Sequence, residues 1–248
     1  MKRILLAALL LTPLALGAQN HQFVIKDTAA HVVDTYLRML NFEALPDDST
    51  LYLESTITSP GSPDTLVMHR WYAKPEMHRV EVRRNGALIS GLCTNGKDRY
   101  RKYIPRLGYW EDLASDKFQT EFLGYDFRAP LHQWRDNGIT LAWNGTTLYK
   151  EQSLHVVKAI DPNRYDRYYM FDPSLNLLTL VIEELTVNGD SVDATPAHID
   201  WKAFHEYQPI GESLVPSLES FMRDGNITII ATRPQLQPHN TLIFNRDQ

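Results

Sequence analysis

Side chains able to perform catalysis or bind a metal are present in this chain, but none occurs at a spacing that such chemistry requires. The nine histidines form no H-E-x-x-H or H-x-H pattern, and Cys93, the single cysteine, cannot build a thiolate site by itself. The sequence also has no G-x-S-x-G motif, no G-x-x-x-x-G-K-S/T motif, and no G-x-G-x-x-G motif after a strand. We therefore expect no metal, no cofactor and no enzymatic activity.

Neighbouring carboxylates are the remaining candidates for acid–base chemistry. Asp47-Asp48, Glu111-Asp112 and Glu183-Glu184 could supply the acid and the base of a glycoside hydrolase. Adjacent residues on a strand point to opposite faces, however, so such pairs seldom act on one substrate. Solvated surface charge is the simpler interpretation. An unrecognised hydrolase that uses a carboxylate or histidine pair is therefore our third and weakest hypothesis.

The composition is that of a globular protein with a full core. The chain has 248 residues, of which 43% are hydrophobic and 22% are charged. Its 25 Lys and Arg residues are outnumbered by 30 Asp and Glu residues, giving a formal net charge of −5. Because a nucleic-acid backbone requires a basic surface, nucleic acid is excluded as an expected partner.

The N-terminus has the layout of a cleavable export signal. Met1-Lys2-Arg3 forms a short basic start, residues 4–16 are almost entirely apolar, and Gly17-Ala18 supplies small residues for cleavage. This apolar run is too short to span a bilayer, which needs about 20 residues. We therefore predict a signal peptide over residues 1–18, a single domain over 19–248, a periplasmic location and no transmembrane segment in the mature chain.

Two periodicities divide the rest of the chain. Asp27 or Thr28 can cap an amphipathic helix that runs to about Asn41, whereas from Ser49 onward apolar and polar residues alternate with period two. Five Asn-Gly dipeptides supply the positive φ angles of hairpin turns, at 85–86, 95–96, 137–138, 144–145 and 188–189. The alternating segments predict about 11 to 13 antiparallel strands. They cover residues 49–57, 66–73, 77–83, 87–94, 98–103, 154–160, 165–171, 177–185, 198–207, 214–222 and 227–232, with a further strand from Ile139 and a possible last one over 241–244.

A segment without alternation interrupts the strands between Pro105 and Arg135. Phe118 and Phe122 are four residues apart, and Pro130 can open a second short helix that carries Leu131 and Trp134. This spacing predicts one or two short helices in a long connection. Long connections inside compact domains are often lids or binding loops.

Several strands are apolar on both faces. Residues 177–182 are apolar at nearly every position, and residues 66–68 together with 71–73 are similar, whereas a sheet with one solvated face would alternate. Such strands need cover on both sides. The space inside a curved sheet of this kind is either a packed core or a cavity for an apolar ligand, and the pattern leaves both open. Cys93 lies in an apolar alternating stretch and is expected to be buried.

Several stretches together resemble one known family. Residues 70–80 contain a strand, a Lys74-Pro75 turn and a second strand, and Asn95-Gly96-Lys97 leads into residues 100–103. Residues 168–178 and 207–216 carry a late aromatic, Asp-Pro and Gly pattern. These stretches, and the order of elements over roughly residues 28–246, resemble the LolA/LolB-like family of outer-membrane lipoprotein carriers and lipoprotein-sorting proteins.

The resemblance implies a mainly β (α+β) fold: a strongly curved, antiparallel, unclosed β-barrel of about 11 strands, with an N-terminal helix and a short helical lid over the mouth. It also implies a periplasmic carrier that holds lipid or lipoprotein acyl chains in a hydrophobic cavity without covalent chemistry. Inner- and outer-membrane lipoprotein-trafficking components are its implied partners. The family's turn arginine, a latch for the lid, corresponds here to Lys74. The expected lipid-binding residues are Met68, Trp71, Tyr72, Val80, Val82, Tyr100, Phe118, Phe122, Tyr125, Phe127, Leu131, Trp134, Phe171 and Leu178.

A second hypothesis comes from another functional class. A secreted β module could bind glycan or protein through exposed aromatic residues such as Trp110, Trp143 and Trp201. The lipid-carrier hypothesis predicts that the aromatic residues of the 118–134 segment face a ligand. The binding-module hypothesis instead predicts that binding survives their removal.

Overall fold

The computed structural model describes residues 28–122, 125, 131–132, 134–161, 166–183, 200–223 and 226–245. The predicted signal peptide, Phe127 and the Asn188-Gly189 turn lie outside these residues. Among the described residues, no helix is long and apolar enough to cross a membrane. The chain divides into two compact units. The minor unit holds the described residues of 28–37 and 134–183, and the major unit holds those of 38–132 and 200–245.

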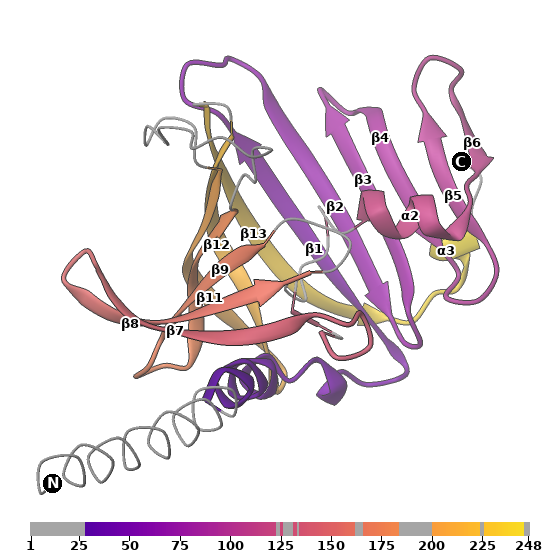
Figure 1. Ribbon diagram of the computed structural model, residues 1–248. Coiled ribbons are helices and arrows are strands. Elements are labelled where there is room, and N and C mark those ends of the chain that lie inside the picture. Colours follow the sequence, from indigo (N-terminus) through magenta and orange to yellow (C-terminus); the bar gives the residue numbers. More distant parts are fainter. Residues whose placement is uncertain are drawn as a thin grey trace, which may run out of the picture. The chain divides into compact units, whose positions relative to one another are not determined.

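The major unit is built on an antiparallel sheet (Figure 1). Its strands lie in the order β6-β5-β4-β3-β2-β1-β13-β12-β11, and β6 pairs only with β5 among the described residues, so this sheet has an open edge. The bounds are β1 (Ser49–Thr58), β2 (Thr65–Ala73), β3 (Met77–Arg84), β4 (Ala87–Thr94), β5 (Tyr100–Ile104), β6 (Tyr109–Asp112), β11 (Trp201–Ile210), β12 (Ser213–Arg223) and β13 (Asn226–Pro238), with the short helices η1 (Phe42–Ala44), α2 (Ser115–Phe122) and α3 (Leu242–Asn245).

The minor unit contains the remaining antiparallel strands. Its strands lie in the order β10-β9-β8-β7, with bounds β7 (Thr140–Tyr149), β8 (Gln152–Ile160), β9 (Arg167–Asp172) and β10 (Leu177–Glu183). The helix of residues 28–40 begins in this unit, where Tyr36 packs edge-on against Phe171 at 5.4 Å between ring centroids. Asp34 of the same helix accepts hydrogen bonds from Trp134 and Arg135. The predicted mainly β, antiparallel and unclosed fold with an N-terminal helix is therefore confirmed.

Two Asn-Gly dipeptides have different structural roles. Asn85-Gly86 forms the two-residue turn between β3 and β4 as predicted, with φ of 50° and 80°. Asn144-Gly145 does not form a turn: it lies inside β7, where the register with β8 shifts between Trp143 and Thr146. Gly145, at φ 87°, supports a β-bulge there, and the hairpin turn is Lys150-Glu151 with φ of 47° and 67°. The prediction of a turn at 144–145 was wrong because a bulge and a turn both favour positive φ.

The segment between β5 and β7 contains more strand and less helix than predicted. Tyr109–Asp112 is the strand β6, which the sequence analysis missed, and α2 carries Phe118 and Phe122 as expected. The described part of the second predicted helix, including Leu131 and Trp134, consists of turns. At the C-terminus, the predicted strand over 241–244 is instead the helical turn α3.

Two opposite faces of β2, β3 and β4 organise the major unit. The cross-strand register places Met68, Val80 and Leu92 on one face, which we call the inner face, and Trp71 and Arg79 on the other, the outer face. Figure 1 shows α2 lying over the β3–β5 part of the sheet. Because the central residues of β3 are buried on both faces, each face needs its own cover.

A buried ion network occupies the outer face. Glu81 accepts hydrogen bonds from Arg79 Nε at 2.8 Å and from Arg83 Nη2 at 2.6 Å, and its side chain is 6% exposed. Burial alone would raise the pKa of Glu81, but the hydrogen bonds and charges of Arg83 and Arg79 outweigh burial and lower that pKa. The same Arg79 lies 4.9 Å from the ring centroid of Trp110.

The short helix α3, near the C-terminus of the chain, packs against this network. Arg79 Nη1 donates to the Ile243 carbonyl at 2.8 Å, and Cys93 Sγ donates to the Phe244 carbonyl at 3.0 Å. Cys93 is 3% exposed, which confirms the predicted buried cysteine. Burial raises the pKa of its thiol to about 11, although nearby arginines act in the opposite direction.

Gly96 provides a first prediction because its backbone touches the β2–β3 turn. It has φ of 74°, and a Cβ at this position would lie 2.7 Å from the Pro75 carbonyl oxygen. Gly86 has a similar φ of 80° but open space around it. Gly86→Ala should therefore cost about 1–2 kcal/mol of unfolding free energy in urea, and Gly96→Ala should cost clearly more. Equal losses would mean that the 95–99 loop does not contact Pro75 in solution.

The lowered pKa of Glu81 predicts acid sensitivity. The ionised carboxylate stabilises the fold above the unfolded-state pKa of about 4.3, and this contribution disappears as pH falls toward the lower folded-state pKa. Glu81→Gln should cost about 3–5 kcal/mol at neutral pH, because a buried guanidinium loses its partner. The difference from wild type should shrink below about pH 4. Denaturant titrations across pH measure this, with the exposed Glu111→Gln as control; a pH-independent difference would contradict the assignment.

Candidate functional site

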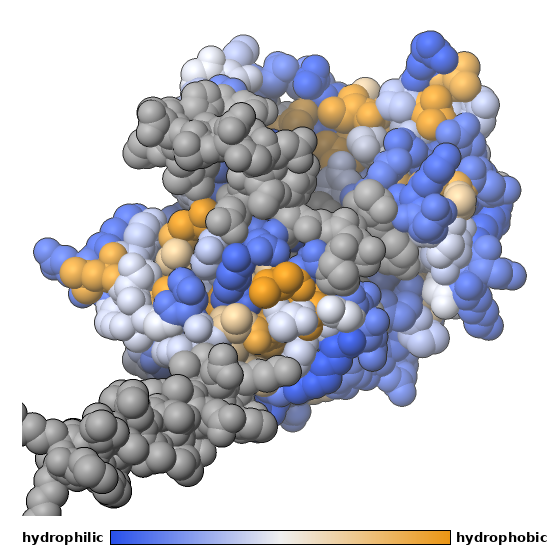
Figure 2. Space-filling view, in the orientation of Figure 1, coloured by the Kyte–Doolittle hydropathy of each residue, from blue (hydrophilic) through white to orange (hydrophobic). Residues whose placement is uncertain are grey.

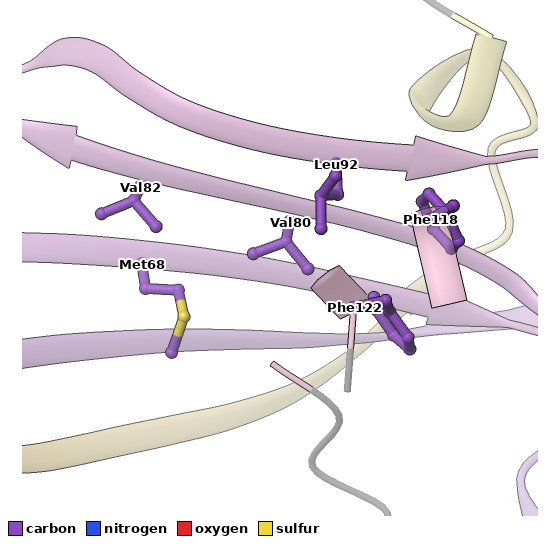
Figure 3. Packing of buried hydrophobic residues seen from close by; sticks show 6 residues of the cluster. All are labelled: Met68, Val80, Val82, Leu92, Phe118 and Phe122. Atoms are coloured by element: carbon purple, nitrogen blue, oxygen red, sulfur yellow. The ribbon is translucent and has the colours of Figure 1, made fainter. Parts of the chain in front are cut away.

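The inner face of the major unit carries one buried apolar cluster. Met68 lies opposite Val82, and Val80 lies opposite Leu92, so the alternation of three neighbouring strands brings these side chains together. Figure 3 shows them with Phe118 and Phe122 of α2. The cluster consists of Met68, Val80, Val82, Leu92, Phe118 and Phe122, bordered by the partly buried Ile57, Leu66, Ile89, Tyr100, Leu113 and Tyr125.

The two phenylalanines of α2 close this cluster from above the sheet. Their spacing of four residues places them on one side of the helix, where the rings stack at 5.5 Å between centroids. Phe118 also contacts Tyr100 at 5.2 Å, and Phe122 contacts His78 at 4.5 Å. Lys102 of β5 also donates to Glu121 of α2 at 2.8 Å. The helix is therefore held to the sheet mainly by aromatic burial.

Figure 3 also shows that the cluster extends beyond the aromatic cover. Phe118 and Phe122 gather near Leu92 and Val80, whereas Met68 and Val82 lie further along their strands. Met68 is 4% exposed and Val82 is 7% exposed. In the view of Figure 2, the surface is largely hydrophilic, with hydrophobic residues in separate patches. The apolar side chains of the site are thus mostly buried rather than exposed to solvent.

A group of polar side chains interrupts the apolar inner face. Arg70 is 5% exposed and lies between Met68 and Tyr72 on β2. Its Nη2 donates to Ser55 Oγ at 3.0 Å and to Thr232 Oγ1 at 3.4 Å, and these two hydroxyls are 2.8 Å apart. Arg70 Nη1 donates to the Tyr125 carbonyl at 3.4 Å. The inner face therefore offers fixed hydrogen-bond donors next to an apolar surface.

The structure brings together about half of the predicted lipid-binding residues. The inner-face cluster or its border contains Met68, Val80, Val82, Tyr100, Phe118, Phe122 and Tyr125. Tyr72 adjoins them, since it stacks on His78 at 5.0 Å. Trp71 does not join them: it lies on the outer face and packs against the cluster of Ala73, Cys93, Trp110 and Phe244. Adjacent strand residues face opposite ways, so Trp71 and Tyr72 cannot line the same surface.

The remaining predicted residues lie apart from this cluster. Leu131 is fully buried in the major unit. Trp134, Phe171 and Leu178 belong to the minor unit, where Phe171 packs on Tyr36. Phe127 is outside the described residues.

Lys74, the predicted latch, contacts a different segment from the one expected. Its Nζ donates to the Glu43 carbonyl at 2.7 Å and lies 3.2 Å from an Asp47 oxygen. Within the described part of the chain, these contacts fix the segment around η1 rather than residues 118–134. The segment that follows α2 is instead contacted by Arg70, through the Tyr125 carbonyl.

The sequence analysis missed Ser55, Arg70, Leu92 and Thr232. Strand alternation could have found Arg70, because it places Arg70 on the same face of the predicted strand as Met68 and Tyr72. Thr232 lies opposite Ser55 only through the long-range pairing of β1 with β13. That register is not readable from local periodicity.

The other two hypotheses find less support in the described residues. Trp110 is 5% exposed, which corrects its assignment as an exposed binding aromatic, and Trp143 and Trp201 are half-buried. Among the described residues, no group of three or more His, Cys, Asp or Glu side chains could hold a metal ion.

The fold of the chain is similar to solved structures of very different sequence. No protein-family model and no curated protein sequence matches this chain. A LolA superfamily protein from Nitrosomonas europaea aligns with a TM-score of 0.57 at 9% identity, over 88% of this chain and 97% of that chain. A DUF1329 family protein from Desulfovibrio piger gives 0.56 at 10% identity, over 87% and 96%. A putative outer membrane lipoprotein-sorting protein domain from Vibrio parahaemolyticus gives 0.52 at 10% identity, over 86% and 100%.

At such identities the similarity concerns the fold alone. The chain shares the fold of these proteins and is LolA-like in architecture. The resemblance inferred from the sequence is therefore confirmed at the level of the fold.

The packing of α2 predicts a large cost for removing one of its rings. Phe118 is 1% exposed, so Phe118→Ala should lower the unfolding free energy by about 3–5 kcal/mol. Leu107→Ala is the control: Leu107 is 51% exposed, and its loss should cost less than about 0.5 kcal/mol. Urea unfolding measures both. A loss below about 1 kcal/mol for Phe118→Ala would mean that α2 does not cover the inner face in solution.

Proposed function

We propose that this protein is an exported carrier that holds the acyl chain of a lipid or lipoprotein on the inner face of the major unit, beneath α2. One observation carries the proposal: an aromatic helix closes a buried apolar cluster on a fold shared with a LolA superfamily protein and a lipoprotein-sorting domain. The proposed ligand surface is the inner-face cluster and its border.

The free energy of transferring an acyl chain from water to an apolar protein surface is sufficient for such binding. Each buried CH₂ group contributes about 0.8 kcal/mol, so a chain of about 16 carbons gains on the order of 10 kcal/mol before ordering costs. No covalent chemistry is needed. The partly buried border residues Ile57, Leu66 and Ile89 give the chain a first apolar contact, from which it reaches Met68 and Val82.

The proposal gives α2 the role of the predicted lid. In the structure, Phe118 and Phe122 occupy the apolar surface that an acyl chain would cover at the Leu92 end. A chain that enters there replaces one buried apolar group by another, so loading and release need no external energy source in principle. The partners that deliver and accept the lipid would be membrane components of lipoprotein trafficking.

The proposed setting follows from the N-terminal sequence. Cleavage after residue 18 would release a mature domain of residues 19–248 into the periplasm. A carrier in that compartment keeps hydrocarbon chains out of water between two membranes. Because the chain has a single cysteine, it can form no internal disulfide, and the mature domain would rely on packing.

Native mass spectrometry of the protein purified from its own cell envelope tests this function. The expected spectrum contains polypeptide mass plus a lipid, and the delipidated protein should take up a fluorescent fatty-acid probe saturably. Met68→Trp fills the inner face beyond the two phenylalanines and should weaken probe binding at least about tenfold, a loss of about 1.4 kcal/mol.

The matched control for this experiment is the neighbouring residue. Val67 points to the outer face, so Val67→Trp should leave probe binding unchanged. Bare polypeptide mass together with no probe uptake would refute the carrier function. Equal effects of the two Trp variants would place the probe elsewhere.

A further inference from the structure

The polar group on the inner face has an unusual composition for a protein interior. Arg70, Ser55 and Thr232 are 5%, 0% and 4% exposed, and they come from β2, β1 and β13. Burying a guanidinium and two hydroxyls is costly unless they form hydrogen bonds. We call these three residues the polar site of the inner face.

A count of hydrogens shows that the site has a donor to spare. Each hydroxyl carries one hydrogen, and the contact of 2.8 Å between Ser55 and Thr232 uses one of the two. Arg70 donates to both oxygens and cannot accept the other hydrogen, because a guanidinium has no acceptor. Within the described ranges, the structure gives neither hydroxyl another acceptor. One O–H group of this nearly fully buried pair therefore remains available.

The apolar neighbours of the site show which kind of ligand could use that donor. Ser55 lies opposite Met68 in the β1–β2 register, and Arg70 lies opposite Val80 in the β2–β3 register. Met68 and Val80 both belong to the inner-face cluster. A hydrocarbon chain lying on these two residues would end beside a hydroxyl donor and a guanidinium, which is a favourable place for an oxygen acceptor.

We infer that the polar site receives the carbonyl or carboxylate oxygen of the acyl ligand. This inference rests on the proposed function and adds an orientation to it: the acyl head lies at Ser55 and Thr232, and the chain extends over Met68 and Val80. The hydroxyl donates to the ligand oxygen, and the positive charge of Arg70 favours an ester carbonyl dipole or a carboxylate. A cationic head group is disfavoured at the same place.

A second hydroxyl pair near the same end of the sheet provides a matched control. Ser59, which directly follows β1, and Thr228 of β13 have hydroxyl oxygens 3.1 Å apart, and no guanidinium contact accompanies them among the described residues. Ile57 and Ile230 separate this pair from the polar site. Removing its hydroxyls should cost stability in the same way without changing recognition of the acyl head.

The test measures how well three ligands displace an uncharged apolar dye, N-phenyl-1-naphthylamine, from the delipidated protein. The ligands are dodecanoate, methyl dodecanoate and dodecane. The variants are Thr232→Val, Ser55→Ala with Thr232→Val, and the control Ser59→Ala with Thr228→Val. In the site variants, affinity for dodecanoate and its ester should fall about tenfold, while affinity for dodecane stays unchanged; the control should retain all three affinities.

Each outcome decides a separate point. Loss for both oxygenated ligands supports recognition of the acyl carbonyl, and loss for dodecanoate alone supports recognition of a carboxylate. Equal loss for dodecane, or no loss for any ligand, overturns the inference, because the hydroxyls are then structural. If the double variant does not unfold cooperatively, the Thr232→Val result decides, since that change keeps the Ser55–Arg70 bond. Failure of wild type to bind any ligand would instead reject the carrier function.

Discussion

A strand that is buried on both faces must be covered on both, and the major unit depends on this constraint. In β3, five successive residues from His78 to Val82 are each at most 7% exposed. Their alternation sends Val80 and Val82 to the inner face and the charged Arg79 and Glu81 to the outer face. The two faces are therefore stabilised differently. Aromatic rings of α2 cover Val80, whereas the Ile243 carbonyl of α3 accepts a hydrogen bond from Arg79 of the Arg79–Glu81 pair. Neither helix is long enough to be stable alone, so each exists because the strand beneath it requires cover.

The sequence predicted the elements that are controlled by local periodicity. The N-terminal helix and most strands are where alternation placed them, and Asn85-Gly86 makes the expected hairpin. The errors have a common cause, which is that a short segment takes its conformation from tertiary contacts. The segment of α3 is apolar enough for a strand, yet it is helical where Arg79 and Cys93 bond its carbonyls. Likewise, Asn144-Gly145 is a bulge because β8 continues to pair beyond it.

The candidate site was predictable where it depends only on the alternation of side chains between the two faces of a strand. Met68, Val80 and Val82 share one face by simple alternation, and the i, i+4 spacing of Phe118 and Phe122 gives α2 a single apolar side. The same alternation also explains why Trp71 lies on the outer face. The polar site was not predictable, because Thr232 reaches Ser55 only through pairing between strands that are far apart in the sequence. Such pairing is fixed by the whole sheet rather than by either strand.

Under the proposed function, the free-energy cost of releasing α2 from the inner face follows from the contacts that hold it there. A helix of eight residues has little stability of its own, so its cost of release is mainly the burial lost by Phe118 and Phe122. Two buried phenylalanines and an acyl chain bury comparable amounts of apolar surface, so exchanging one for the other changes the free energy far less than exposing the inner face to water. The inner face would then be covered by the two rings when the ligand is absent and by the acyl chain when it is bound. The hydrogen bonds that Arg70, Ser55 and Thr232 make with one another do not involve Phe118 or Phe122, so the proposed exchange would leave them in place. Under the proposed function, hydrophobic cover would set how readily a ligand enters, while the buried hydroxyls would determine which end of the ligand is recognised.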